Sequence, residues 1–348
     1  MISHKFIIWA CGLLFVFGSC AEDMVKPIEN DKDAPGTVQD VKTESLPGAV
    51  KFTYTLPSDP DLLYVLAKYT NKTGKVMEFR SSFYTNSVTV EGFGDTDTYK
   101  VELYTVDRSE NRSQPQIVEV APLTPPILSC YESLSMVSDF GGMTFEMDNQ
   151  FKSDLAIYVC TPDELGDMVL AETFYSAREE IAYSVRGYDA VPRRFGIFLQ
   201  DKYGNETDTL FTELTPIYER ELDKTKFREM YLQNDSRVDS YDGKMEYVWN
   251  GRISKDGDSG GVGLHTGTGT KDGPAVFTFD LGVLAKLSRF ALWAIQDDKH
   301  FYNDMSPRRY EVWGCATEPN PDGSWDQWVK LLDMENVKPS GSPIGILT

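Results

Sequence analysis

Positive charge is scarce in this chain. It carries 34 lysines and arginines against 54 aspartates and glutamates, which gives a formal net charge of −20. Because nucleic-acid phosphates are held by basic surfaces, this balance excludes a nucleic-acid partner. A strongly acidic surface suits a soluble protein whose copies repel one another.

Histidine is also scarce, which bears on a match to chymotrypsin-like proteases. The pentapeptide Gly-Asp-Ser-Gly-Gly at 257–261 has the signature of their nucleophilic serine. That chemistry needs a histidine upstream of the serine, but outside the first residues the chain has only His265 and His300, both downstream. We therefore interpret the pentapeptide as a glycine-rich loop. No pair of carboxylates with glycosidase spacing can be selected either, so we expect no enzyme.

Cysteine is too sparse for a disulfide scaffold. Two of the five cysteines lie in the first twenty residues, which leaves Cys130, Cys160 and Cys315. A bridge between Cys130 and Cys160 within one domain stays open. Isolated cysteines are more often buried as small hydrophobic side chains.

Long hydrophobic runs are absent, and the longest lies near the N-terminus. Residues 6–17 form an apolar run of twelve after Lys5, too short to span a bilayer as a mature helix. Gly18-Ser19 before Cys20 resembles the bacterial lipobox. The resemblance implies a signal peptide over 1–19, lipidation of Cys20, and an anchored tether over 20–35. An ordinary signal peptide with an incidental cysteine is the alternative. Acidic residues 21–23 resemble the tag that sends lipoproteins to the extracellular face of the outer membrane.

Short β-rich runs without a helical period follow the tether. They alternate between apolar and polar residues and are separated by turn residues, at 50–54, 62–69, 76–80, 87–90, 99–106 and 117–120. Six or seven strands in about ninety residues predict a β-sandwich.

An internal repeat indicates a second sandwich. Residues 61–65 return at 154–159 with an offset of 93, 107–113 return at 201–207 with an offset of 94, and Leu-Thr-Pro at 123–125 returns at 214–216 with an offset of 91. We predict fibronectin type III-like sandwiches over 36–122 and 123–217. The repeated motif D-x-x-x-N-x-[ST] is interpreted as a hairpin whose Asp and Asn cap their own backbone. Binding of calcium or another ligand there is the alternative.

The C-terminal part, 218–348, predicts a further β domain. Residues 277–281 alternate as a half-buried strand, and 289–295 and 310–313 are predicted as two more, with Trp293 and Trp313 in the core. The strand end at 280–282, Trp313 and the turn at Trp325 resemble the discoidin, or coagulation-factor 5/8 type C, family over about 219–330. The resemblance implies a galactose-binding-like jelly roll of eight strands that binds rather than catalyses. Its last two strands find no counterpart before Thr348, so we expect a reduced or truncated form.

Sugar recognition asks for aromatic faces together with planar donors and acceptors. The loop 297–304 offers both, and Trp249 and His265 lie in two other loops expected at the same end of the domain. The candidate carbohydrate-binding residues are His300, Phe301, Tyr302, Asn303, Arg308, Trp249 and His265. The alternative is that Phe301 and Tyr302 pack back onto the domain.

Metal ligands are few. Asp256 and Asp258 are candidates for a structural calcium site, because discoidin-like modules often hold calcium near the position of Trp249-Asn250-Gly251. No third ligand is identified, and we expect no other cofactor.

In domain order, the whole chain resembles surface lipoproteins built from uncharacterised domain families numbered 4959, 5126 and 5000. Those proteins occur beside SusD-like proteins and their transporters in polysaccharide-utilisation systems. The resemblance implies an all-β, non-catalytic protein that captures glycan at the cell surface. The alternative is a structural or adhesin-like subunit that docks a partner outer-membrane protein through its acidic sandwiches.

Overall fold

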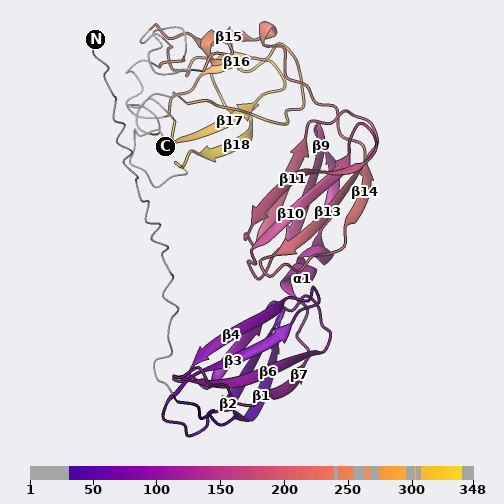
Figure 1. Ribbon diagram of the computed structural model, residues 1–348. Helices are drawn as coiled ribbons and strands as arrows, with labels where there is room; N and C mark the ends of the chain where they lie inside the picture. The colour runs from indigo at the N-terminus through magenta and orange to yellow at the C-terminus, as the bar shows by residue number, and fades with distance from the viewer. Residues whose placement is uncertain are drawn as a thin grey trace, which may run out of the picture. The chain divides into compact units, whose positions relative to one another are not determined.

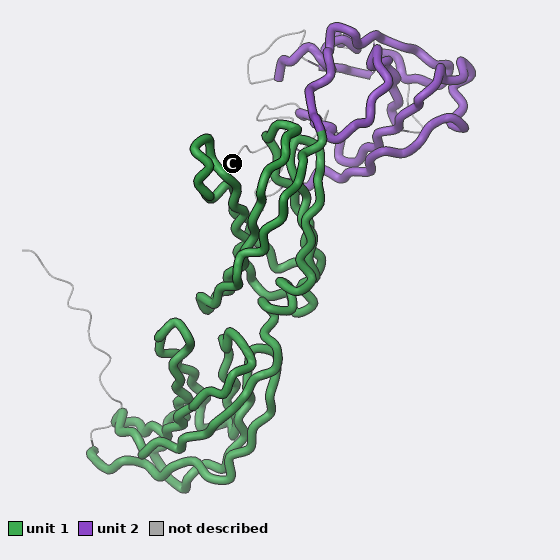
Figure 2. The backbone as a smooth tube through the Cα atoms, turned by 90° about the vertical axis from the view of Figure 1, so that its right-hand side faces the viewer, with its two compact units in different colours: residues 1–217 green, residues 218–348 purple. Residues whose placement is uncertain are grey.

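The computed structural model describes residues 31–238, 242–253, 263–266, 274–294, 302 and 307–338. The chain divides into two compact units, 1–217 and 218–348 (Figure 2). The predicted signal peptide and Cys20 lie outside the described residues. Within the described residues, no helix is long and apolar enough to cross a membrane.

The first sandwich has two antiparallel sheets, ordered β1-β2-β5 and β4-β3-β6-β7 (Figure 1). Its strands are β1 (Gln39–Leu46), β2 (Ala49–Thr55), β3 (Leu62–Thr70), β4 (Val76–Ser82), β5 (Ser87–Glu91), β6 (Tyr99–Asp107) and β7 (Gln116–Val120). All six predicted strands are confirmed. The strand that sequence reasoning missed is β1, whose side chains are mostly exposed and therefore show little apolar alternation.

The second sandwich repeats this order with sheets β8-β9-β12 and β11-β10-β13-β14. Its strands are β8 (Ser135–Asp139), β9 (Gly142–Asp148), β10 (Leu155–Pro162), β11 (Met168–Ser176), β12 (Glu180–Arg186), β13 (Arg193–Asp201) and β14 (Leu210–Leu214). A helix, α1 (Pro126–Ser133), precedes it and packs Ile127 and Cys130 into its core. The prediction of an all-β fold with tandem sandwiches is confirmed.

Each sandwich has its own core, built from alternate residues of its strands. Phe52 of β2 and Phe145 of β9 occupy the same place in the two strands and are fully buried. The Cys130–Cys160 bridge is wrong, because both thiols are free. Cys130 lies in the second core, where burial raises the pKa of its thiol to about 11. It is a small hydrophobic core residue, as isolated cysteines usually are.

The repeated motif caps its own hairpin in both sandwiches. Asp107 accepts hydrogen bonds from the backbone N–H and the side-chain amide of Asn111, at 2.8 and 2.9 Å. Asp201 accepts the same two bonds from Asn205, at 2.9 and 2.8 Å. The last motif residue, Ser113 or Thr207, accepts a bond from the preceding strand at 3.1 or 3.0 Å. The capping interpretation is thus confirmed.

One match of the internal repeat is wrong. Leu123 bonds to the backbone of Leu46 and Gly48, and the residue that makes the same bonds in the second sandwich is Ile217, with Asp139 and Gly141. The structural offset there is 94 residues, not 91. Leu-Thr-Pro misled because its second copy begins inside strand β14, three residues before the junction.

The second unit has two two-stranded sheets among its described residues. Strand β15 (Arg228–Met230) pairs with β16 (Thr278–Asp280), and β17 (Arg309–Gly314) pairs with β18 (Val329–Glu335). The 3-10 turns η1 (Lys224–Lys226) and η2 (Met245–Val248) complete the assigned elements. The discoidin-like jelly roll stays a prediction.

The strand predicted over 289–295 is wrong. Residues 289–294 form no strand, and Trp293 is 59% exposed instead of lying in the core. This segment has no paired partner among the described strands, and without one β-propensity does not make a strand. The strands predicted around Phe279 and Tyr310 exist because β15 and β18 pair with them.

Candidate functional site

A surface pocket of about 500 Å³ lies in the second unit and opens broadly to solvent. It is built by the two 3-10 turns and the residues that follow η2. Its lining consists of Lys224, Thr225, Glu246, Tyr247, Trp249, Asn250 and Gly251. Aromatic, amide, hydroxyl and charged groups therefore meet in one small hollow.

Trp249 is held in place at the end of η2. Its backbone N–H donates to the carbonyl of Glu246 at 3.3 Å, and the fully buried Met245 anchors the start of the turn. The half-buried indole packs edge-on against Phe227, with ring centroids 5.8 Å apart, and its plane is tilted by 32° from that of Phe279 of β16, with centroids 5.2 Å apart. Phe227 and Phe279 thus form an aromatic wall that holds the Trp249 ring, which also lines the pocket.

The polar groups of the pocket are mostly exposed and already oriented. Asn250 accepts a hydrogen bond from the backbone N–H of Arg252 at 2.8 Å, which turns its side-chain oxygen toward the chain. The Thr225 hydroxyl donates to Asp223 at 2.6 Å, and the Lys224 ammonium pairs with Glu221. Gly251 has φ of +78°, the left-handed backbone that favours glycine.

Of the predicted sugar-binding residues, the pocket contains Trp249. His265 is half-buried and is absent from the lining, and Tyr302 is half-buried with φ of +52°. The remaining loop residues, His300, Phe301 and Asn303, lie outside the described residues, as do Asp256 and Asp258. The predicted grouping of these side chains around one ligand therefore stays a prediction.

Arg308 has a protein partner in the structure. Its Nε donates to Glu335 of β18 at 3.1 Å, and Arg309 donates to the other oxygen of the same carboxylate at 3.1 Å. One carboxylate thus holds two guanidinium groups at the β17–β18 pair. A sugar hydroxyl at Arg308 would compete with this contact.

Sequence reasoning missed several lining residues. Tyr247 and Glu246 precede Trp249 in the same turn, so their spacing was a usable signal. Lys224 and Thr225 lie about 25 residues away in sequence, and nothing in their local pattern links them to Trp249. Only the pairing of β15 with β16 brings η1 into the neighbourhood of the aromatic wall.

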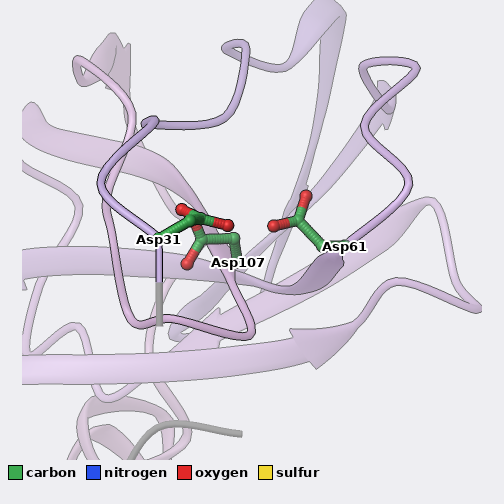
Figure 3. Close-up of side chains that lie close together, drawn as sticks. All are labelled: Asp31, Asp61 and Asp107. Carbon is green, nitrogen blue, oxygen red and sulfur yellow. The ribbon is translucent and has the colours of Figure 1, made fainter. Parts of the chain in front are cut away.

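A second cluster of polar groups lies in the first sandwich (Figure 3). Asp31, Asp61 and Asp107 have carboxylate oxygens within 4.8 Å of one another, and Asp61 points toward the other two from a separate segment. Desolvation raises the pKa of the Asp61 carboxyl, and repulsion from Asp31 and Asp107 raises it further. The Asp107 carboxylate already accepts the hydrogen bonds that cap its hairpin, so we assign this cluster no ligand.

Models of three families match successive parts of the chain. They are Domain of unknown function (DUF4959) at residues 35–122, Domain of unknown function (DUF5126) at 123–225, and another domain of unknown function, DUF5000, at 249–348. A search of curated proteins finds no match.

One solved structure has a sequence almost identical to part of this chain. A SusE-like protein is 98% identical in a match that covers 37% of this chain and 73% of that one, with a TM-score of 0.36. A two-domain fibronectin type III segment of chicken tenascin is 12% identical over 52% of this chain and 99% of its own (TM-score 0.25). The fibronectin domain of human collagen alpha-1(XX) is 14% identical over 28% and 92% (TM-score 0.24). Since the two fibronectin scores are too low to carry an argument, the fold rests on strand pairing. The identity and coverage of the first match show that the chain belongs to the SusE-like proteins.

Proposed function

We propose that this chain is a surface protein of a polysaccharide-utilisation system that binds glycan in the pocket at Trp249 without cleaving it. Membership of the SusE-like proteins supports the proposal that the chain works in a polysaccharide-utilisation system. The observation that carries the binding site is the half-buried indole of Trp249, held by Phe227 and Phe279 at the border of an open pocket.

The chemistry of the lining suits a sugar. A pyranose presents an apolar C–H face that stacks on an aromatic ring, and its hydroxyls need donors and acceptors at the rim. Trp249 and Tyr247 supply the rings, and Asn250, Glu246 and Lys224 supply the polar groups. Because Trp249 is already held by the aromatic wall, little side-chain freedom is lost on binding.

The same lining argues against hydrolysis. Cleavage of a glycosidic bond requires two carboxyl groups on opposite sides of that bond. Among the residues that line the pocket, Glu246 is the one carboxylate. A bound glycan would therefore be held intact, consistent with the non-catalytic function proposed.

The remaining parts of the proposal concern location and partners. Cys20 would carry the lipid, and residues 20–35 would tether the sandwiches at the extracellular face of the outer membrane. A SusD-like protein and its transporter would receive the captured glycan. The loop with His300, Phe301 and Tyr302 would provide a second contact with the sugar chain.

The test is a glycan-array screen of the soluble chain starting at Ala21, followed by titration of whichever polysaccharide binds. We expect Trp249→Ala to weaken binding by about 3- to 10-fold, the value of one aromatic stacking contact. Trp325→Ala is the matched control, because Trp325 is 45% exposed and packs on Trp313 and Trp328 away from the lining.

Three outcomes separate the alternatives. Loss of binding in Trp249→Ala alone supports the pocket. Unchanged binding in Trp249→Ala, with loss in the triple variant His300→Ala, Phe301→Ala, Tyr302→Ala, moves the site to that loop. If the folded protein binds no glycan at all, the proposed function is wrong.

A further inference from the structure

Apolar side chains gather on the outer face of one sheet of the second sandwich. This face belongs to the four-stranded sheet β11-β10-β13-β14, and its members alternate with the inward-facing residues of the same strands, which are buried on β10 and β13. They are Met168, Leu170 and Tyr175 on β11, Tyr158 and Cys160 on β10, Phe198 on β13 and Phe211 on β14. Tyr175 is 75% exposed, Leu170 56% and Phe211 42%.

The aromatic side chains on this face are held in fixed positions. Tyr158 and Phe198 stack across neighbouring strands, with centroids 4.7 Å apart and planes at 12°. Phe211 covers Gly196, where an added Cβ would lie 2.6 Å from the Phe211 ring. The Arg194 guanidinium lies 4.0 Å from the centroid of the same ring. The glycine thus makes room for a ring that the arginine then covers.

The first sandwich provides a control within the chain. In the equivalent sheet, β4-β3-β6-β7, charged side chains replace part of this face: Lys68, Glu78 and Glu102 stand in the places of Cys160, Leu170 and Gly196. Leu66, Tyr104 and Ile117 stand in the places of Tyr158, Phe198 and Phe211, so the rest of the face is apolar in both sandwiches. Lys100 and Glu119 pair across strands at 3.7 Å. Because two sandwiches with the same strand order differ at the positions of Cys160 and Leu170, the fold does not require apolar side chains there.

The geometry favours a protein over a sugar as the ligand. The stacked rings of Tyr158 and Phe198 turn a face toward each other, and the outer face of Phe211 is covered by Arg194. A pyranose would find few free ring faces for stacking. Methionine, aromatic residues and arginine are the side chains enriched in protein–protein interfaces. Apolar patches of this kind on soluble proteins mark such interfaces.

The open edge of this sheet adds a second docking feature. Strand β11 lies at the edge, and its nine residues include one charged side chain, Glu172. The equivalent edge strand β4 has seven residues and carries both Glu78 and Arg80. Charged side chains protect sheet edges from pairing with other chains, so by charge β11 is the less protected edge, although a bulge interrupts its pairing with β10 between Leu170 and Glu172.

The charges around the apolar face define the partner. Exposed acidic side chains lie in the loops beside it, at Asp163, Glu164 and Asp167 between β10 and β11 and at Asp208 before β14, and its one central cation, Arg194, lies opposite Glu213. A second copy would bring the same acidic rim and a further charge of −20. We propose that this face docks a different protein, whose contact surface has an apolar centre and a basic rim.

The test places a photo-crosslinking amino acid at Leu170 or Tyr175 of the full chain, in the cells that produce it. Matched control positions are Ile117 and Glu78 on the outer face of the first sandwich. We expect one protein adduct from the second sandwich and none from the controls. The cross-linked peptide of that protein should lie on a surface with apolar and basic side chains.

Binding of the identified protein to the purified chain completes the test. Leu170→Asp should weaken it at least about 10-fold, Ile117→Asp should leave it unchanged, and added salt should weaken it through the charged rims. Both substituted side chains are exposed, so thermal unfolding should not change. Tyr175→Asp serves as a second variant if Leu170→Asp fails to fold.

Several results would overturn the proposal. An adduct of twice the chain's mass would identify a second copy, and a polysaccharide adduct would make the face a sugar site. Equal adducts from both sandwiches, no adduct at all, or an affinity unaffected by Leu170→Asp and Tyr175→Asp would each refute docking here. None of these results touches the glycan proposal at Trp249.

Discussion

The two sandwiches share a fold but differ in the side chains on their outer sheet faces. Strand order, the capped hairpin of Asp107 and Asp201, and the backbone bonds of Leu123 and Ile217 are the same in both. The outer sheet faces differ in part, with Lys68 and Glu78 of the first sandwich standing where the second has Cys160 and Leu170. Features that recur are therefore those needed for folding, and features that differ indicate separate functions.

The capped hairpins show the same division at the level of single side chains. In the first sandwich, the side-chain amide of Asn111 also donates to Asp31 of the segment before β1, at 3.0 Å. In the second, the amide of Asn205 donates to the carbonyl of Gly92 at 3.2 Å, and the Tyr203 hydroxyl bonds to Glu91. In the first sandwich the motif thus contacts the segment before β1, and in the second sandwich it contacts the first sandwich.

The largest difference is expected at the first residue of the second strand in each sandwich, which is Ala49 in β2 and Gly142 in β9. A Cβ on Gly142 would lie 1.8 Å from the carbonyl oxygen of Val185, on the paired strand β12. Gly142→Ala should therefore force β9 and β12 apart and lower the free energy of unfolding by about 3 kcal/mol, the upper range for overpacking. Denaturant titration of the soluble chain measures this loss.

Ala49→Gly is the reciprocal variant. It removes one methyl group and increases the backbone entropy of the unfolded chain, so we expect the free energy of unfolding to fall by about 1 kcal/mol. Hydrogen exchange should locate each loss in the sandwich that carries the change. Equal losses in the two variants would contradict the crowding inferred at Gly142.

Sequence alone predicted the repeated part of the fold well, because alternation and capping are local signals. The strands from Val50 to Val120 and the hairpin motifs needed no distant information. The apolar outer face was missed, since the tertiary pairing of β11, β10, β13 and β14 is what brings Leu170, Tyr158 and Phe211 together. Helix α1 was missed because its eight residues are too few for a clear helical period.

The sequence predicted only part of the candidate pocket, because local patterns do not show which distant residues meet. The sequence predicted Trp249 as a binding residue in a loop and Phe279 as part of an alternating strand. Their contact, and the arrival of Lys224 beside them, depend on the β15–β16 pair across about fifty residues. Trp293 was misassigned because β-propensity says nothing about whether a partner strand exists.

An intermediate effect is expected at the glycines that follow β5 and β12. Gly92 and Gly187 both have left-handed backbone, with φ of +84° and +102°. An added Cβ on Gly92 meets the Tyr203 ring at 2.8 Å, whereas the space around Gly187 is open. Gly187→Ala should cost about 1–2 kcal/mol of stability from backbone strain, and Gly92→Ala about 1 kcal/mol more from the displaced ring.

A double variant isolates the contribution of the ring. In a background of Tyr203→Ala, the further change Gly92→Ala should cost the same as Gly187→Ala, because only the backbone strain remains. Denaturant unfolding of the wild type, the two single variants, the double variant and Gly187→Ala provides the comparison. An excess cost at Gly92 that persists without the ring would mean that Tyr203 does not restrict this junction.

The smallest effect is expected at Asp61, which has an acidic cluster around it that its counterpart Asp154 lacks among the described residues. Desolvation and the nearby Asp31 and Asp107 raise the folded-state pKa of Asp61 above its unfolded value. A carboxyl with a raised pKa binds its proton more tightly in the folded state, so it opposes folding at neutral pH and ceases to do so in acid. Asp61→Asn should therefore raise the melting temperature slightly at pH 7, with the gain vanishing as the pH falls below the unfolded pKa of aspartate, about 4. Asp154→Asn is the matched control, because it makes the same substitution at the equivalent position of the second sandwich. Thermal melts of the three proteins between pH 3 and pH 7 measure the effect, and a gain that grows in acid would contradict it.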